Sequence, residues 1–295
     1  MKQDYLVRGI AADGMLRVNG AITTNTCNEA AKRHGTWPIA TAALGRLLTG
    51  AIMMGAMLLK DDQRMMLQVR GDGPLREIVA VTDGHGHVKG YVGEPHVHFP
   101  LNDEGKLDVA RAIGQGRLTV TRQIGDGEPY LGNVPLLTGE IGDDLAYYFA
   151  RSEQVPSVVS LGVLVETDNS VRAAGGYILQ VMPGASEEII SFVESKAQNL
   201  AGVSRSIDAG HTPEEILTEN FGELGLEFLE TTPVSFVCDC TRDRFERALL
   251  SLGREELESL LADQGQAETV CQFCGAKYLF SRQDVERLVE IAKQR

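Results

Sequence analysis

Four of the five cysteines in this 295-residue chain lie in its last fifth, in two closely spaced pairs. Cys238 and Cys240 form a Cys-x-Cys pair in FVCDCTRDR, and Cys271 and Cys274 form a Cys-x-x-Cys pair in CQFCGAKYLF. Two such pairs, separated here by residues 241–270, are typical of a tetrahedral zinc site in which each pair binds from a short loop. We therefore predict that these four cysteines bind one Zn(II) per chain.

Neither buried free thiols nor a thioredoxin-like redox pair accounts for the cysteine pattern as well as a metal site does. Buried free thiols would not explain the spacing, and a thioredoxin-like redox pair follows a strand in a βαβ unit, a pattern that does not surround these cysteines. An odd number of cysteines also fits poorly with a secreted disulfide framework. The first residues, MKQDYLVRGIAADG, have no apolar signal-peptide core. We expect a cytoplasmic protein whose thiols stay reduced.

Charge and hydrophobicity narrow the possible partners. The net charge of -13 argues against a general nucleic-acid binder, because phosphate backbones are bound by basic surfaces. The same acidity argues against docking on an anionic membrane. Residues 39–59 are apolar and long enough to cross a bilayer, but they include Arg46, which is costly at membrane depth. We interpret this segment as a buried helix and predict neither a nucleic-acid nor a membrane partner.

The order of the patterns along the chain predicts an α+β fold. Residues 1–182 are expected to form a mixed sheet-and-helix domain, because strand runs and helix runs are grouped rather than alternating. The expected elements are a hairpin turned at Asp13-Gly14, three strands in 64–93, a strand pair in 117–139, a helix in 140–154 and a hairpin in 157–181.

Residues 183–232 are predicted to form a metastable helical linker. One amphipathic helix is expected over 186–200, and a second begins at Thr212, with Pro213 in its first turn and Glu215 completing a capping box. Both helices are short, so their stability must come from packing against another surface. Residues 233–295 are predicted to form a small zinc-binding domain that ends in a helix over 281–294.

Oxidation is expected to act strongly on such a domain. A zinc thiolate site near the surface loses its metal when the thiolates become disulfides, here between nearest neighbours, Cys238 with Cys240 and Cys271 with Cys274. These bridges close very small loops and stabilise little, whereas structural zinc contributes about 10–16 kcal/mol to a small domain. The exchange predicts a domain that an oxidant unfolds and a reductant restores.

Motifs along nearly the whole chain resemble the redox-regulated holdase chaperones of bacteria, the thirty-three-kilodalton heat-shock protein family. The motifs that carry the resemblance are ALGRLLTGAIMM (43–54), GDGPLREI (71–78), KGYVGEP (89–95), GEIGDDLAYYFARSEQVPS (139–157), AAGGYILQVMPGA (173–185) and the two cysteine segments. Thr241 stands where the family has serine, which leaves the four expected ligands unchanged.

The resemblance implies a redox-regulated, ATP-independent holdase rather than an enzyme. In this family the reduced, zinc-bound form is inactive. Oxidants release zinc and form the two neighbour disulfides, after which the linker loses structure and the protein forms a homodimer. Carried to this chain, the ligands and redox-active residues are Cys238, Cys240, Cys271 and Cys274, and the partners are unfolding client proteins.

Two alternative functions remain open at the level of sequence. The first is a constitutive zinc module that binds a nucleic acid or a protein partner, which a salt-dependent complex of the reduced protein would indicate. The second is a thiol–disulfide oxidoreductase, which catalytic turnover of a disulfide substrate would indicate.

The remaining chemically active residues are given structural interpretations. Cys27 has no partner cysteine nearby and is expected to be a packed or half-exposed thiol beside a helix start. Four histidines lie close together in the sequence: His85, His87, His96 and His98. No carboxylate or cysteine pattern completes a metal site around them, so we expect them at the ends of strands on the surface. The methionines of 53–66 are expected to fill the core, and we predict no catalytic centre.

Overall fold

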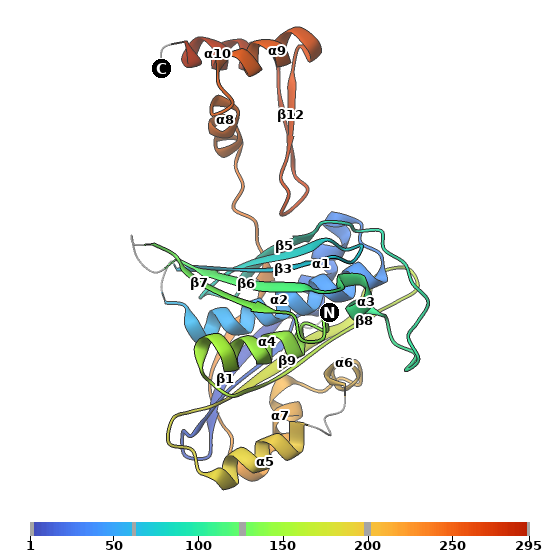
Figure 1. Ribbon diagram of the computed structural model, residues 1–295, viewed down its shortest axis with the longest axis vertical. Helices are drawn as coiled ribbons and strands as arrows, with labels where there is room; N and C mark the ends of the chain where they lie inside the picture. Colours follow the sequence, from blue (N-terminus) through green and yellow to red (C-terminus); the bar gives the residue numbers. More distant parts are fainter. Residues whose placement is uncertain (1–2, 61–62, 124–127, 198–201, 294–295) are drawn as a thin grey trace. The chain divides into compact units, whose positions relative to one another are not determined.

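The computed structural model describes residues 3–60, 63–123, 128–197 and 202–293 (Figure 1). The chain divides into two compact units, Met1–Val237 and Cys238–Arg295. Sheets and helices are both present, as the α+β prediction requires. Each unit has its own cluster of buried apolar residues.

A five-stranded antiparallel sheet forms one layer of the first unit. Its strand order is β10 (Glu227–Pro233), β1 (Tyr5–Ala11), β2 (Leu16–Ile22), β9 (Val171–Val181) and β8 (Ser157–Val165). The predicted hairpins β1–β2 and β8–β9 are therefore confirmed. The turn between β1 and β2 has positive φ at Ala12, Asp13 and Gly14, which places the bend where the Asp-Gly pair indicated it.

A six-stranded sheet forms a second layer. Its order is β11 (Ser235–Phe236), β5 (His87–Val92), β4 (Glu77–Asp83), β3 (Arg64–Gly71), β6 (Gly116–Arg122) and β7 (Tyr130–Pro135). All neighbours are antiparallel except β11, which runs parallel to β5. The three strands predicted in 64–93 and the pair predicted in 117–139 are confirmed.

The apolar segment near residue 50 forms helix α2 (Pro38–Leu58), which contacts strands of both sheets (Figure 1). It is the one helix in the described residues that is long and apolar enough to cross a membrane, and 89% of its most apolar 18-residue window is buried inside the protein. A helix buried on all sides is apolar on all sides, so this position explains its composition. Arg46, the charged residue within it, forms an ion pair with Glu140.

Glycine lets α2 pack close to the six-stranded sheet. A Cβ atom at Gly55 would lie 2.8 Å from the backbone oxygen of Asp83, at the end of β4. Any side chain there would push the helix off the strand. The methionines of this region also contribute to the core, because Met53, Met54 and Met65 are fully buried.

Further helices cover the sheets of the first unit. Helix α1 (Thr24–His34) contacts β9 and α2, α3 (Val109–Ile113) contacts α2, and α4 (Gly142–Tyr148) continues into a π-helical turn, η1 (Phe149–Glu153). The helix predicted in 140–154 is therefore present, with a widened last turn.

Helices α5 (Glu187–Ala197), α6 (Val203–Asp208) and α7 (Pro213–Phe221) pack on the five-stranded sheet. Phe221 of α7 meets Tyr177 of β9 edge to face, with ring centroids 5.8 Å apart. The predicted capping box is confirmed: Thr212 N–H donates to Glu215 (2.7 Å), and Glu215 N–H donates to the Thr212 hydroxyl (3.2 Å). The end of the first predicted helix, residues 198–200, lies outside the described residues.

Residues 183–232, the predicted linker, lie within the first compact unit. They contain the three helices, a short 3-10 turn η2 (Gly222–Leu224) and a strand, β10, that the sequence patterns did not indicate. A short polar edge strand has little hydrophobic periodicity, and its ladder with β1 depends on a partner more than 200 positions away. The three-part division of the chain, with a separable linker, stays a prediction.

The second unit is small. It contains α8 (Arg242–Leu250), α9 (Arg254–Gln264), the hairpin β12 (Ala267–Val270) and β13 (Lys277–Phe280), and α10 (Arg282–Ala292). The final helix was predicted, and Ser281 caps it as a capping box with Asp284. Its buried core consists of Leu249, Leu257, Ala267, Phe280, Val285, Leu288 and Val289. A core of this size gives a domain little stability without a staple.

Candidate metal centre

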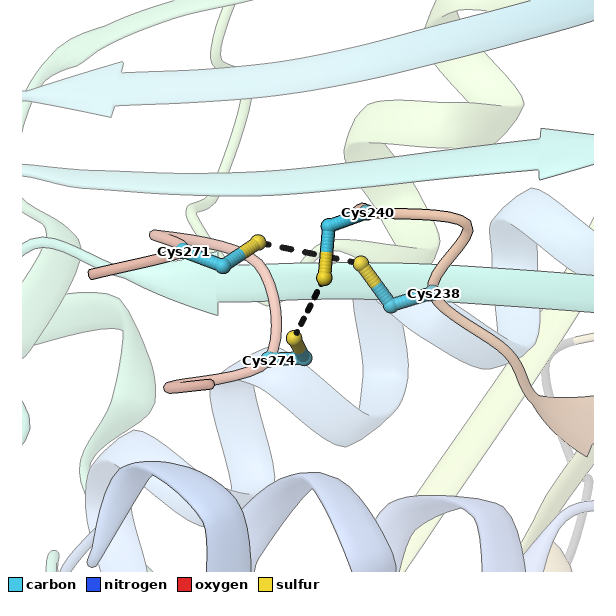
Figure 2. A group of neighbouring side chains, drawn as sticks. All are labelled: Cys238, Cys240, Cys271 and Cys274. Carbon is cyan, nitrogen blue, oxygen red and sulfur yellow. Dashed lines mark hydrogen bonds between the residues drawn. The ribbon is translucent and has the colours of Figure 1, made fainter. Parts of the chain in front are cut away.

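The fold of the second unit brings the four predicted ligands together (Figure 2). Cys238 and Cys240 lie on the extended segment before α8, Cys271 directly follows β12, and Cys274 lies in the turn before β13. Their Sγ atoms all lie within 4.8 Å of one another, although the two segments are far apart in sequence. The sequence prediction of one four-cysteine cluster therefore agrees with the geometry.

Local backbone structure shapes the turn that carries Cys271 and Cys274. Gly275 N–H donates to Cys271 O (2.8 Å), and Cys271 N–H donates to Ala276 O (2.8 Å), which folds the chain tightly around the first sulfur. Gly275 has a φ of 71°, in the left-handed region that glycine adopts without strain. This explains why glycine follows the second cysteine of the pair.

A helix cap fixes the other segment. The Thr241 hydroxyl accepts a hydrogen bond from Arg244 N–H (3.3 Å) and so caps α8 directly after Cys240. A threonine hydroxyl caps a helix much as a serine hydroxyl does. The departure at this position therefore leaves the local structure intact.

The distances between the sulfurs match a tetrahedral tetrathiolate site. Two sulfur pairs join the two segments, with 3.7 Å between the sulfurs of Cys238 and Cys271 and 3.4 Å between those of Cys240 and Cys274 (Figure 2). Around a zinc ion with Zn–S bonds of about 2.3 Å, tetrahedral geometry separates the sulfurs by roughly 3.8 Å. A disulfide bond would need about 2.0 Å. All four cysteines are free thiols here, and the arrangement can hold a metal ion.

Two further side chains join the segments directly. Arg242 donates to Leu279 O (2.6 Å) and to Asp284 (2.9 Å), and its guanidinium lies 4.2 Å from the centre of the Phe280 ring. The Tyr278 hydroxyl lies 3.2 Å from Cys240 Sγ and donates to Cys240 O (3.1 Å). Neither residue was predicted from the sequence. The one feature of the sequence that could have indicated Arg242 and Tyr278 is that each lies within a few residues of a cysteine pair.

Burial and hydrogen bonding act on these thiols in opposite directions. Burial raises the pKa of Cys238 to about 12 and also raises the pKa of Cys274. Burial acts the same way on Cys240, but hydrogen bonds with Tyr278 and the neighbouring cysteines outweigh it and leave that pKa lowered. Without a cation, Cys238 and Cys274 therefore keep their protons at neutral pH, and metal binding displaces them.

The other candidates have structural roles or lie apart. Cys27 lies in α1 with 2% of its surface exposed, and its sulfur is 3.6 Å from both the Thr23 hydroxyl and Gly45 O. It is a packed thiol, as predicted. The four clustered histidines are exposed, and the four-cysteine cluster is the one group of three or more possible metal ligands within the described ranges.

Comparison with known proteins gives matches over nearly the whole chain. A protein-family model described as "Hsp33 protein" matches residues 4–281. The "33 kDa chaperonin" of Staphylococcus carnosus is 50% identical over 291 residues, covering 98% of this chain and 99% of that protein. The Bacillus subtilis protein of the same name is 49% identical, covering 97% and 98%. A crystal structure of a Thermotoga maritima 33 kDa chaperonin (heat shock protein 33 homolog) superposes with a TM-score of 0.94 at 38% identity, covering 100% of both chains.

Replacing one ligand tests the metal assignment. The wild-type chain is expected to hold one zinc, and Cys271→Ser is expected to lose tight binding because three sulfurs leave the tetrahedral site incomplete. Cys27→Ser is the matched control, since it makes the same change in the first unit and should keep full zinc. Metal analysis after dialysis against a chelator gives the measurement. Full zinc occupancy in Cys271→Ser would contradict the assignment.

The reactivity of Cys27 gives a second prediction. Burial raises its pKa to about 12, so the thiol stays protonated between pH 7 and 9 and reacts more readily only as the pH rises toward that value. At pH 8 the thiolate fraction is roughly one in 10⁴. We expect iodoacetamide to label Cys27 only after the first unit unfolds, as measured by mass spectrometry of its peptide with and without denaturant. Equal labelling rates in the two states would show that this thiol is accessible.

Proposed function

Because this chain belongs to the Hsp33 family, we propose that it is an ATP-independent holdase chaperone that oxidation switches on, and not an enzyme. The relatives named 33 kDa chaperonin support the chaperone activity, and the four-cysteine cluster supports redox control. The observation that carries the proposal is the position of that cluster. It joins the two segments of a unit whose buried core is too small to be secure alone.

Zinc is the metal that this donor set fits best. Four thiolates with no oxygen ligand favour a soft, tetrahedral ion over calcium or magnesium. Cys238, Cys240, Cys271 and Cys274 would hold one ion per chain, and the bound ion supplies structural closure of the unit. Zinc binding then becomes part of the free energy of folding of residues 238–295.

Oxidation removes that closure. One thiolate attacks hydrogen peroxide to form a sulfenic acid with release of hydroxide, and a second thiolate displaces hydroxide from the sulfenic sulfur to form the disulfide. Formation of each disulfide thus transfers two electrons from a pair of thiolates to one molecule of hydrogen peroxide. We propose the pairs Cys238–Cys240 and Cys271–Cys274, which close minimal loops and cannot replace the metal as a staple.

The linker segment (residues 183–232) is the proposed second part of the switch. Its helices cover an apolar face of the five-stranded sheet, where Leu217 and Phe221 pack on Val7, Val18 and Tyr177. The last residue of β10, Pro233, lies only five positions before Cys238, so the segment is tied to the second unit by a short stretch of chain. When that unit unfolds, the weakest neighbouring structure is the first to open.

Opening of the linker segment uncovers two apolar surfaces, one on its helices and one on the sheet. Both are suited to unfolding client proteins, which expose apolar side chains of their own. We propose that the oxidised form also associates into a homodimer and that the protein acts in the cytoplasm, where the thiols are kept reduced until oxidative stress. The net charge of -13 disfavours the nucleic-acid alternative.

The direct test compares the two redox states of one preparation. We expect the oxidised protein to suppress aggregation of a thermally unfolding client and the reduced, zinc-bound protein not to do so, with zinc release following the gain of activity. Peptide mapping should find Cys238–Cys240 and Cys271–Cys274 rather than disulfides that join the two segments. Equal protection by the reduced and oxidised forms would rule out a redox switch.

A second test opens the linker segment without oxidant. Val193 of α5 is 2% exposed and packs with Ala11 and Leu16, so Val193→Asp buries a charge and should release the helix. We expect chaperone activity in the reduced protein while zinc stays bound. Ser191→Asp, which adds the same charge at an exposed position of α5, should stay inactive. An inactive, reduced Val193→Asp protein whose α5 amides have lost hydrogen-exchange protection would contradict the role of the segment.

A further inference from the structure

The hydroxyl of Tyr278 is in direct contact with the cysteine cluster, although it was not among the predicted ligands. Its oxygen lies 3.2 Å from Cys240 Sγ and 3.1 Å from Cys240 O, across 38 residues of sequence. Among the hydroxyl groups of residues 238–293, it is the one within hydrogen-bonding distance of a cluster sulfur. A side-chain hydroxyl therefore distinguishes Cys240, whereas Cys238 and Cys274 are contacted by the backbone N–H groups of Cys240 and Ala276.

Two elements hold the phenol in place. Its ring packs against Phe245 of α8, with centroids 4.9 Å apart and an angle of 32° between the rings. Its backbone lies in β13, paired with Thr269 of β12. The ring is therefore positioned by the helix that follows Cys240 and by the hairpin that carries the other cysteine pair. Removing only the hydroxyl leaves both sets of contacts in place.

A hydrogen bond to a ligand sulfur changes its chemistry in a known direction. A metal-bound thiolate can only accept hydrogen bonds, so the phenol, with its single proton, is the donor in that state. Donation draws electron density from the sulfur and fixes its orientation toward the metal. A sulfur whose lone pairs are shared in this way is a weaker nucleophile toward peroxide and a less readily lost ligand.

We propose that Tyr278 is the positioning residue that holds Cys240 in the metal site and slows both loss of the metal and oxidation of this sulfur. This role rests on the proposed function, since it assumes a zinc thiolate centre that peroxide opens. Tyr278 would then help to set the oxidant level at which the switch operates.

The carbonyl oxygen of Cys240 is a second possible acceptor for the Tyr278 hydroxyl. When Cys240 forms a disulfide, its sulfur becomes a poor acceptor, but the Tyr278 proton still has Cys240 O at 3.1 Å. The hydroxyl therefore keeps a partner in the oxidised state until the segment moves. Loss of the contact with the Cys240 sulfur therefore does not leave the Tyr278 hydroxyl without a hydrogen-bond acceptor. Breaking this contact carries no added desolvation penalty.

Tyr278→Phe tests the proposal on the zinc-loaded, full-length protein. Zinc release is followed by the absorbance of a colorimetric chelator, first without oxidant and then at a fixed peroxide concentration. We expect release about 10-fold faster or more than in the wild type, the lower end of what loss of an outer-shell partner costs in metal affinity. Tyr91→Phe is the matched control, because it removes a hydroxyl that donates to Glu77 in the first unit. It should release zinc at the wild-type rate.

A measurement on the wild type keeps the proposal testable if Tyr278→Phe does not fold. In the zinc-bound protein, iodoacetamide should modify Cys238 faster than Cys240, as located by fragmentation of their shared peptide. Equal rates at the two cysteines would overturn the role of Tyr278, as would wild-type zinc release from Tyr278→Phe or faster release from Tyr91→Phe. If the wild-type protein binds no zinc, or if it retains its zinc during treatment with peroxide, the proposed function is wrong and this inference fails with it.

Discussion

The contact among four cysteine sulfurs is the interaction on which the second unit depends. Sulfurs from two distant segments lie within 4.8 Å of one another, in a unit whose buried apolar cluster has seven residues. Four thiols at this distance contribute little by themselves, whereas four thiolates around a dication contribute most of the folding free energy of a small domain. In the proposed function, stability and redox chemistry therefore reside in the same four sulfurs, and a reaction at sulfur changes the fold of this unit.

The first unit contains one cysteine, Cys27, whose surroundings keep its thiol unreactive. Cys27 lies in α1 against α2 with 2% of its surface exposed, and burial raises its pKa to about 12, whereas Cys238 and Cys240 are only partly buried. Reactivity toward oxidants follows thiolate character and access. Access therefore separates Cys27 from Cys238 and Cys240, and membership of the four-sulfur cluster separates it from the buried Cys271 and Cys274.

Within the first unit, the helices differ in how deeply they are buried. Helix α2 is buried between two sheets, and Gly55 allows close contact with β4, so this layer is the permanent core. Helices α5 to α7 cover the outer face of one sheet and are short, so they depend on that surface for stability. In the proposed function, these helices open to expose apolar surface, because a short surface cover opens at lower free energy than the core beneath it.

The sequence by itself determined the α+β class, most strand pairs, the capped helix at Thr212 and the four cysteines, because periodicity, caps and ligand spacing are local properties. Tertiary structure decided the rest. Strand β10 exists because β1 offers an edge, the charge of Arg46 is compensated by Glu140 from a distant helix start, and Tyr278 reaches Cys240 only because the hairpin and α8 meet. Such contacts depend on which surfaces come together, and no stretch of local sequence contains that information.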